Sequence, residues 1–357
     1  MTGKPEIGPL PLVETPGTTV FGAAADVRRL TQAMWSSAII QAAAQLGLAD
    51  LIGDDPVGTA ELAGKCGADP GALRRLMRAL AAHGIFHRTA DGRYEHTAFS
   101  RSLVTTVPGS VSNIAMLAGS GWNWTMWARL ADAVRSGESL FPAHYGRTLY
   151  EYFAEVEPGE GEVFNRAMSE SSRWTSGPVA DALDLTGVSV VADVAGGQGS
   201  LLRTLLERNP DLSGVLLDSP EVLRQADPAL REGPLAARCR LVPTDIRQAV
   251  PAEADVYLLR QVTHIWENDV CVSVLRNCAH SARPGARVVL VDHLIEEGPE
   301  PNSTFSTLLD LLMMLVGTGG ERTESEFAEL FARAGLRYDG VVRIPSPLTL
   351  VTASVPS

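Results

Sequence analysis

The feature that most constrains the fold of this chain is the segment at residues 190–200, which reads VVADVAGGQGS. An apolar run ends there at an acidic residue, and a glycine-rich turn follows it. Leucines with helical spacing come next, namely Leu201, Leu202, Leu205 and Leu206. This order predicts a buried strand, a tight turn and a helix start, which together form the first unit of a nucleotide-binding α/β sheet.

The glycine turn departs from the fingerprint of a dinucleotide site. Counted from Gly197 the pattern is Gly-x-Gly-x-x-Leu, so Leu202 occupies the position of the third glycine. Asp218 ends the next apolar run, at a position where an acid can bind a ribose hydroxyl. These residues favour a mononucleoside ligand such as S-adenosylmethionine over NAD, while ordinary turn chemistry is the alternative explanation of the glycines.

Length and composition limit the classes of protein. A chain of 357 residues is expected to hold two domains, because single cores stop growing at roughly 250–300 residues. The net charge of −12 argues against general binding to nucleic acid or anionic membranes. No apolar run approaches the length of a membrane span, and residues 1–19 resemble a disordered arm rather than a signal peptide. Four cysteines without metal-ligand spacing indicate a reduced, cytoplasmic chain with no metal site.

The second half of the chain alternates strands and helices. Residues 20–185 have mainly helical patterns, whereas residues 186–357 contain short apolar runs separated by helical segments. The runs lie at 190–194, 214–218, 239–243, 255–260, 287–292 and roughly 340–351. This alternation predicts a mostly parallel, doubly wound sheet.

Polar side chains follow the ends of five of these runs: Asp193, Asp218, Asp245, His264 and Asp292. Ligands of open α/β sheets bind outside the carboxyl ends of the strands, so these side chains are expected to converge on one crevice. The alternative is that acids end strands simply because they are poor strand formers.

Residues 59–103 have the pattern of a winged helix. Thr59 begins one helix, and Asp69 with Pro70 begins a second whose apolar stripe includes Leu73 and Met77. A hairpin around Asp91-Gly92 follows. Three arginines lie off the stripe (Arg74, Arg75 and Arg78). A DNA-reading helix can have this pattern, but a solvated arginine face is the favoured interpretation.

An upstream helix around residues 34–43 is apolar over much of its surface and therefore needs to be buried. A partner subunit or the core of its own domain are the two candidates for covering it.

His264 is the candidate general base. A lone histidine is more often structural, but Asp292 ends the neighbouring apolar run and Glu321 follows two glycines. If both carboxylates reach the imidazole, they fix its tautomer and raise its basicity, as removal of a proton from a hydroxyl requires.

Three blocks together resemble the S-adenosylmethionine-dependent small-molecule O-methyltransferases, which include plant caffeate-type enzymes and bacterial enzymes of aromatic polyketides and quinones. The blocks are Asp193-x-Ala-Gly-Gly-x-Gly199, His264-x-Trp266 and Gly319-Gly-Glu-Arg-Thr323. The resemblance implies an α/β, Rossmann-like doubly wound methyltransferase domain with an N-terminal, mainly helical winged-helix dimerisation domain. It places the dimerisation domain at 20–110, a helical linker contributing to the acceptor pocket at 111–185 and the cofactor-binding catalytic domain at 186–357.

The resemblance also implies roles for single residues. His264 would be the base, flanked by Asp292 and Glu321, with direct transfer of the methyl group to the acceptor oxygen. S-adenosyl-L-methionine would be held by Met168, Ser172, Asp193, Gly196, Gly197, Gly199, Asp218, Asp245, Ile246 and Arg260. Met313, Trp122 and Trp124 would contact an aromatic acceptor, with helix core as the alternative for all three. The protein would be a homodimer through its N-terminal helices.

The sequence departs from the family pattern at Ala195, which replaces the usual first glycine, at Ile265, where an acid commonly follows the histidine, and at Asp292, where plant members have glutamate. The rival hypotheses are a relative that binds the cofactor without transferring methyl groups, a winged-helix regulator that senses a ligand, and an NAD-dependent dehydrogenase.

Overall fold

The computed structural model describes residues 20–298 and 302–356, and the chain divides into two units. The helical unit comprises residues 20–128 and 150–171, and the sheet unit comprises 129–149, 172–298 and 302–356. Residues 111–185, expected to be one linker, thus contribute to both units. The expected arm at 1–19 lies outside the described residues.

The helical unit contains a winged helix, as the sequence predicted. Asp69 caps the N-terminus of α4 by accepting a hydrogen bond from the amide of Ala72, and Pro70 is the first helical residue. Strands β1 and β2 pair antiparallel, with Phe86 opposite His96. The elements are α1 (Val20–Gln45), α2 (Leu48–Leu51), α3 (Thr59–Cys66), α4 (Pro70–Ala82), β1 (Phe86–Arg88), β2 (Tyr94–His96), α5 (Ala98–Arg101), α6 (Ser112–Ala118) and α7 (Gly121–Ala128). Helices α10 (Leu149–Glu155) and α11 (Pro158–Ala182) follow later in the chain.

The stripe of α4 is buried in the core of this unit, and Arg74, Arg75 and Arg78 are exposed. Of the two candidates for covering the helix at 34–43, the core of its own unit covers only the C-terminal end. Ala43 is buried, but Met34 and Trp35 are 51% and 62% exposed. The helical unit of one chain therefore leaves much of α1 uncovered.

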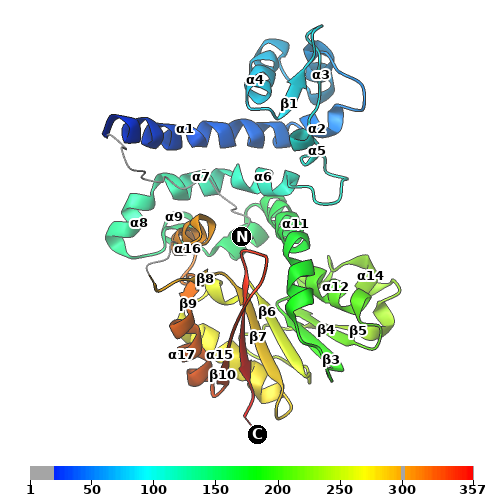
Figure 1. Cartoon of the computed structure of the whole chain (residues 1–357), viewed down its shortest axis with the longest axis vertical. Helices are drawn as coiled ribbons and strands as arrows, with labels where there is room; N and C mark the ends of the chain where they lie inside the picture. The colour runs from blue at the N-terminus through cyan, green and yellow to red at the C-terminus, as the bar shows by residue number, and fades with distance from the viewer. Residues whose placement is uncertain (1–19, 299–301, 357) are drawn as a thin grey trace. The chain divides into compact units, whose positions relative to one another are not determined.

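The sheet unit is built on a seven-stranded sheet of order β10-β11-β7-β6-β3-β4-β5, which Figure 1 shows with helices on both sides. The strands from β7 to β5 in that order are parallel, and β11 and β10 are antiparallel. The large-sheet strands are β3 (Val190–Val194), β4 (Ser213–Asp218), β5 (Cys239–Pro243), β6 (Val256–Arg260), β7 (Arg287–Asp292), β10 (Arg337–Arg343) and β11 (Thr349–Ser354). A separate parallel pair joins β8 (Leu294–Ile295) to β9 (Arg322–Thr323).

Helices cover both faces of the large sheet. Those of this unit are α8 (Leu130–Ser136), α9 (Leu140–Tyr145), α12 (Ser200–Arg208), α13 (Pro220–Leu223), α14 (Pro228–Arg231), α15 (Asn268–Ser281), α16 (Thr304–Val316) and α17 (Glu324–Ala334), with the short 3-10 helices η1 (Ala236–Arg238) and η2 (Thr263–Ile265). Successive strand residues point to opposite faces, so Tyr257 packs with α15 and α17, whereas Leu258 packs with α12 and α14. Figure 1 shows these two helix pairs on opposite sides of the sheet.

One predicted strand was wrong. The apolar run placed at roughly 340–351 is not a single strand, because it covers the end of β10, a turn and the start of β11. Pro345 and Pro347 lie in that turn, and proline cannot donate to a strand ladder. These two prolines were the signal for a break.

Candidate active site

The parallel strand order brings the predicted polar residues to one edge of the sheet. Asp193, Asp218 and Asp292 lie within the C-terminal ends of β3, β4 and β7. Asp245 and His264 follow the ends of β5 and β6 by a few residues. Since these five strands are adjacent and parallel, their carboxyl ends share one edge, as predicted.

His264 is oriented by Glu321. The residue lies in η2, directly after β6, and is 7% exposed. Its Nδ1 nitrogen lies 2.6 Å from Oε1 of Glu321, whose side chain is fully buried. A carboxylate accepts, so Nδ1 carries the proton and Nε2 of the neutral ring is left with a lone pair.

Asp292 does not make the contact with His264 that was expected of a flanking acid. Its Oδ2 accepts a hydrogen bond of 2.5 Å from the hydroxyl of Thr263, and its Oδ1 is buried without a hydrogen-bond partner among the described residues. The side chain of aspartate is one methylene shorter than that of glutamate, and the carboxylate of Asp292 binds the neighbouring Thr263 instead of His264. Asp292 therefore acts on His264 through charge rather than through a hydrogen bond.

The net effect of these surroundings is to make His264 more basic. Burial lowers its pKa, but the hydrogen bond and charge of Glu321, together with the charge of Asp292, outweigh burial and raise the pKa above the ordinary value of 6.5. Burial also raises the pKa of the Asp292 carboxyl, against the opposing charge of His264.

The segment that carries Glu321 lies directly on the His264 loop. A Cβ atom on Gly319 would lie 2.2 Å from the carbonyl oxygen of His264 and 2.6 Å from the amide nitrogen of Trp266, so only glycine permits this approach. The amide of Glu321 donates to Oδ1 of Asp310 on α16, at 2.8 Å. The β8–β9 pair then fixes Arg322 opposite Leu294.

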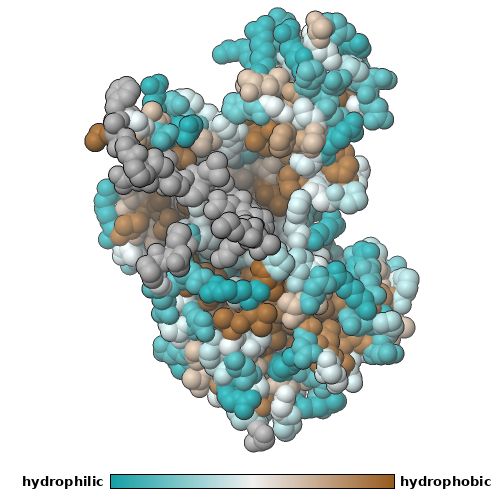
Figure 2. Space-filling view, in the orientation of Figure 1, coloured by the Kyte–Doolittle hydropathy of each residue, from teal (hydrophilic) through white to brown (hydrophobic). Residues whose placement is uncertain are grey.

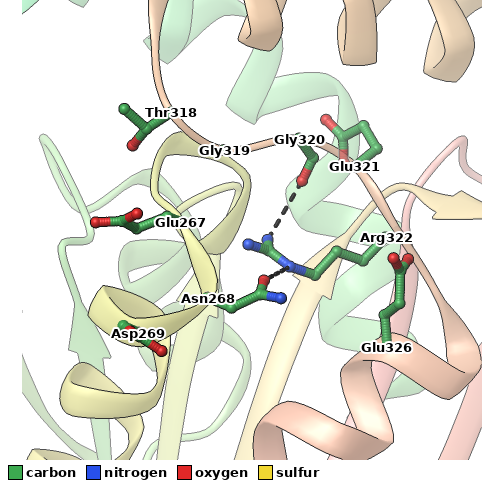
Figure 3. Close-up of a pocket in the computed structure, with 9 residues that line it drawn as sticks. All are labelled: Glu267, Asn268, Asp269, Thr318, Gly319, Gly320, Glu321, Arg322 and Glu326. Carbon is green, nitrogen blue, oxygen red and sulfur yellow. Dashed lines mark hydrogen bonds between the residues drawn. The ribbon is translucent and has the colours of Figure 1, made fainter. Parts of the chain in front are cut away.

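Two residues of this arrangement escaped the sequence analysis. Asp310 belongs to none of the motifs, and Arg322 belongs to the motif at residues 319–323 without an assigned role. Arg322 is 5% exposed and borders a surface pocket of about 400 Å³ that runs along residues 318–322 and 267–269. Figure 3 shows its guanidinium directed at Asn268 and Gly320, whereas the side chain of Glu321 points elsewhere.

The glycine turn after β3 packs closely against β3 and β4. A Cβ atom on Gly196 would lie 2.5 Å from Cγ of Asp193 and 2.6 Å from Cδ1 of Leu216, so backbone replaces a side chain there. Ala195, which departs from the glycine that the family resemblance implies, adopts a left-handed backbone with φ of 54°. The turn is linked to β4, because the amide of Gly197 donates to Oδ2 of Asp218 at 2.9 Å. Gly199 caps the N-terminus of α12.

Asp193 holds an unsatisfied buried oxygen beside this turn. Its Oδ2 has no hydrogen-bond partner within the described part of the chain. Burial raises the pKa of Asp193 to about 6, although the charge of Arg260 opposes the rise. An unpaired buried acceptor is costly, and a cationic donor group on a ligand would satisfy it.

The remaining residues predicted to bind the cofactor are distributed around the same edge or along α11. Arg260 is bound to Ser172, through both its hydroxyl and its carbonyl, and to the hydroxyl of Ser176. Asp245 forms a two-point ion pair with Arg247, at 2.9 Å from Nε and from Nη2. Ile246 is buried in the core of the sheet unit, and Met168, in the helical unit, is 42% exposed.

The three predicted acceptor contacts occupy different environments. Met313 is half-buried on α16, which lies against η2 in the sheet unit. In the helical unit, Trp122 packs edge-on against Phe153, and Nε1 of Trp124 donates to Gln41 of α1 at 3.1 Å. Both tryptophans thus make the helix–helix contacts that were the stated alternative.

Comparison with known proteins identifies the family. A model of the O-methyltransferase domain matches residues 127–337, and a model of the O-methyltransferase dimerisation domain matches residues 29–106. The chain belongs to the O-methyltransferase family. As a member, this O-methyltransferase is an enzyme that uses S-adenosyl-L-methionine, on a Rossmann-like sheet with an N-terminal dimerisation domain.

Relatives match the O-methyltransferase over nearly its whole length. The mitomycin biosynthesis 6-O-methyltransferase of Streptomyces lavendulae is 36% identical over 328 residues, which are 91% of this chain and 93% of that protein. The structure of the mitomycin 7-O-methyltransferase MmcR has a TM-score of 0.85 at 34% identity, covering 94% of this chain and 98% of that one. The O-methyltransferase NcsB1 of neocarzinostatin biosynthesis, in complex with S-adenosylmethionine and 2-hydroxy-5-methyl naphthoic acid, has a TM-score of 0.76 at 29% identity, covering 90% and 96%.

Proposed function

We propose that the enzyme methylates a phenolic hydroxyl of an aromatic secondary metabolite, and that His264 accepts the proton of this hydroxyl at Nε2. The observation that carries the proposal is the 2.6 Å contact between Nδ1 of His264 and Glu321 in a buried site. It selects the tautomer whose lone pair lies on Nε2, as a general base requires.

The basicity of His264 matters because phenols are weak acids. The ordinary pKa values of tyrosine-like phenols and of imidazole, about 10 and 6.5, leave roughly three units between donor and acceptor. The charges of Glu321 and Asp292 raise the pKa of His264 and narrow that difference. Glu321 also stabilises the imidazolium that forms when the proton arrives.

The residues of the glycine turn fit the methyl donor. When bound, S-adenosylmethionine supplies an electrophilic methyl group on a sulfonium. We assign its amino acid portion to the cradle at Gly196 and to the unsatisfied oxygen of Asp193, with Gly197, Gly199, Ser172, Met168 and Arg260 around it. Asp218 would bind the ribose hydroxyls, and Asp245 with Ile246 would border the adenine.

The relatives support an aromatic acceptor. One solved neighbour holds a hydroxylated naphthoic acid, and another methylates mitomycin. Met313 is the side chain of the sheet unit that we assign to contact with the acceptor ring, because its helix borders the His264 loop. Trp122 and Trp124 remain proposed contacts from the helical unit.

We also propose that the enzyme works as a homodimer through its N-terminal helices. Apolar side chains reach the surface of the helical unit (Figure 2), and α1 exposes Val27, Met34 and Trp35. The matched dimerisation domain covers this helix from residue 29.

The four unpaired cysteines support a reducing compartment, the cytoplasm, and the net charge of −12 speaks against nucleic acid or anionic membranes as partners. Within residues 20–298 and 302–356, no helix is long and apolar enough to cross a membrane.

Mass spectrometry tests the function. The full chain is incubated with S-adenosylmethionine and a panel of hydroxynaphthoates, hydroxyquinones and polycyclic phenols, and methylated products and S-adenosylhomocysteine are quantified. We expect an O-methylated product from the wild type and a loss of about 10²–10⁴-fold in His264→Ala, with binding of S-adenosylhomocysteine retained. Full turnover by His264→Ala would overturn the general-base role. Cofactor binding without any product across the panel would favour a non-methylating relative.

A further inference from the structure

We propose that Arg322 is a positioning residue: its guanidinium clamps the loop that carries His264 to the segment that carries Glu321 and so sets the hydrogen bond between them. The proposal rests on the proposed role of His264 as the base. Nothing in the motif itself distinguishes this arginine from a surface residue, and the assignment comes from its contacts.

The guanidinium of Arg322 uses every donor that it has. On the His264 loop, Nη1 donates to the carbonyl oxygen of Thr263 at 2.7 Å and Nη2 to that of Trp266 at 2.8 Å. These two carbonyls bracket His264 along the chain. On its own segment, Nη1 also reaches the carbonyl oxygen of Gly320 at 3.2 Å. Nε donates to the side chain of Asn268 at 3.0 Å, and Nη2 contacts the sulfur of Cys271 at 3.7 Å.

Arginine can make all of these contacts at once, whereas lysine cannot. A guanidinium has five N–H donors in a rigid planar fork, whereas the lysine ammonium has three on a flexible stem. Lysine at this position would keep the charge but lose the simultaneous contact with Thr263 and Trp266. The bonds are shown in part in Figure 3, where Arg322 reaches toward Gly320 and Asn268.

The guanidinium charge has no carboxylate within ion-pair distance among the described residues. It is held by backbone and amide oxygens instead, so its field reaches the imidazole, where it acts against protonation of His264. Glu321 and Asp292 act in the opposite direction. Glu321, Asp292 and Arg322 act on the pKa of His264. The other titratable groups on the elements around its loop are His293, Cys271, Asp310, Glu267 and Asp269.

The two contributions of Arg322, its geometry and its charge, can be separated with two variants of the full-length dimer. Arg322→Met removes both, and Arg322→Lys removes the fork but keeps the charge. Arg333→Met is the matched control, because Arg333 is a partly exposed arginine of the following helix whose ion partner is the surface residue Asp269. His264→Ala is measured in parallel. The readouts are kcat and KM as functions of pH, with the panel phenol that the wild type turns over best. The second readout is the titration of the His264 ring by NMR in histidine-labelled protein saturated with S-adenosylhomocysteine, assigned through His264→Ala.

We expect kcat of Arg322→Met to fall about 10²-fold with little change in KM, as for a misplacement of order 1 Å at a reacting group. Arg322→Lys should lose at least about 10-fold in kcat, and its His264 titration should move to lower pH, because the hydrogen bond that raises this pKa is weakened while the positive charge stays. In Arg322→Met the positive charge is lost as well, so its His264 titration and the acidic limb of its rate profile should lie at higher pH than those of Arg322→Lys. Arg333→Met should match the wild type in both readouts.

Wild-type kcat in Arg322→Lys would overturn the proposal, and this outcome remains decisive if the methionine variant does not fold. A His264 titration in folded Arg322→Met that lies no higher in pH than that of Arg322→Lys would overturn the charge contribution. If His264→Ala keeps full activity, the proposed base fails instead, so failures of the two proposals are distinguishable.

Discussion

The Nδ1 nitrogen of His264 lies 2.6 Å from Oε1 of Glu321, although 57 residues separate them in the chain. The contact joins the loop after β6, the fourth parallel strand along the chain, to the residue directly before β9, which pairs with β8 outside the large sheet. Because the ring and the carboxylate are both buried, their interaction is little screened by water. The catalytic behaviour of the protein should therefore follow the protonation of this pair.

The first prediction concerns pH. The proposed base works as the unprotonated imidazole, and the pKa of His264 is raised, so kcat/KM should rise with pH and reach half of its plateau above 6.5. Glu321→Gln removes the charge that raises this pKa. The variant should lose about 10²-fold in kcat, and its acidic limb should move to lower pH.

Glu326→Gln is the control for this series, because Glu326 is a neighbouring carboxylate that closes the capping box of α17. Its profile should overlay that of the wild type. A Glu321→Gln limb at the wild-type position would show that the ionisation belongs to another group.

The second prediction concerns Thr263. Its hydroxyl is the donor that satisfies one oxygen of the buried Asp292, and valine has the same shape without that donor. Thr263→Val should lower the free energy of unfolding by roughly 1–3 kcal/mol, since it leaves a buried carboxylate without partners. Urea unfolding at neutral pH measures the effect. Thr263→Ser keeps the hydroxyl and should recover most of the loss; equal stability of the valine variant and the wild type would contradict the assigned hydrogen bond.

The third prediction is that the carboxylate of Asp193 lowers the stability of the cofactor-free protein and strengthens cofactor binding. Its pKa is about 6 in the folded chain and 3.8 in a model compound, so its favourable contribution is complete below 3.8 and is lost as pH rises through 6. At neutral pH the ionised, unpaired carboxylate therefore costs stability, by as much as about 3 kcal/mol. Asp193→Asn should raise the melting temperature of the cofactor-free protein above pH 6 but not below 3.8.

The same variant should bind S-adenosylmethionine more weakly, because the charge that we assign to the donor's amino group is gone. Calorimetric titration with S-adenosylhomocysteine gives the affinity. An Asn variant that is both less stable at neutral pH and unchanged in affinity would remove Asp193 from the cofactor site.

The fourth prediction concerns Ala195. A left-handed backbone destabilises a non-glycine residue by roughly 1–2 kcal/mol. Glycine avoids this strain, but its greater conformational entropy in the unfolded chain offsets about 0.5–1 kcal/mol of the gain. Ala195→Gly should therefore stabilise the protein by about 0.5–1 kcal/mol in chemical unfolding, and Ala195→Val should destabilise it. The reverse order of stability would show that the turn is not strained at this position.

Sequence patterns predicted what depends on local chemistry and strand order. Asp69 predicted the start of α4. The acids after the apolar runs predicted the edge of the sheet formed by the carboxyl ends of its strands, because adjacent parallel strands end at the same edge. The hairpin of β10 and β11 was missed because its two apolar strands were merged across Pro345 and Pro347.

The finer geometry of the site could not be predicted from patterns. Whether the carboxylate of Asp292 forms a hydrogen bond with His264 or with Thr263 depends on the length of the Asp292 side chain. The β8–β9 pair has two residues per strand, which is too short to leave a periodic signal. Most contacts of Arg322, and the contact of Asp310 with Glu321, involve backbone atoms, which any residue type supplies and no motif therefore encodes.

Gly319 shows what such contacts mean for the tolerance of this protein to mutation. It has no chemical group to contribute, yet any side chain there would collide with the backbone of His264. A saturation screen for activity should therefore rank position 319 beside the histidine itself. Inactive variants at position 319 would show that two backbone segments must approach closely there. A position that tolerates no substitution in such a screen can therefore be needed for close packing of the backbone as well as for a reactive side chain.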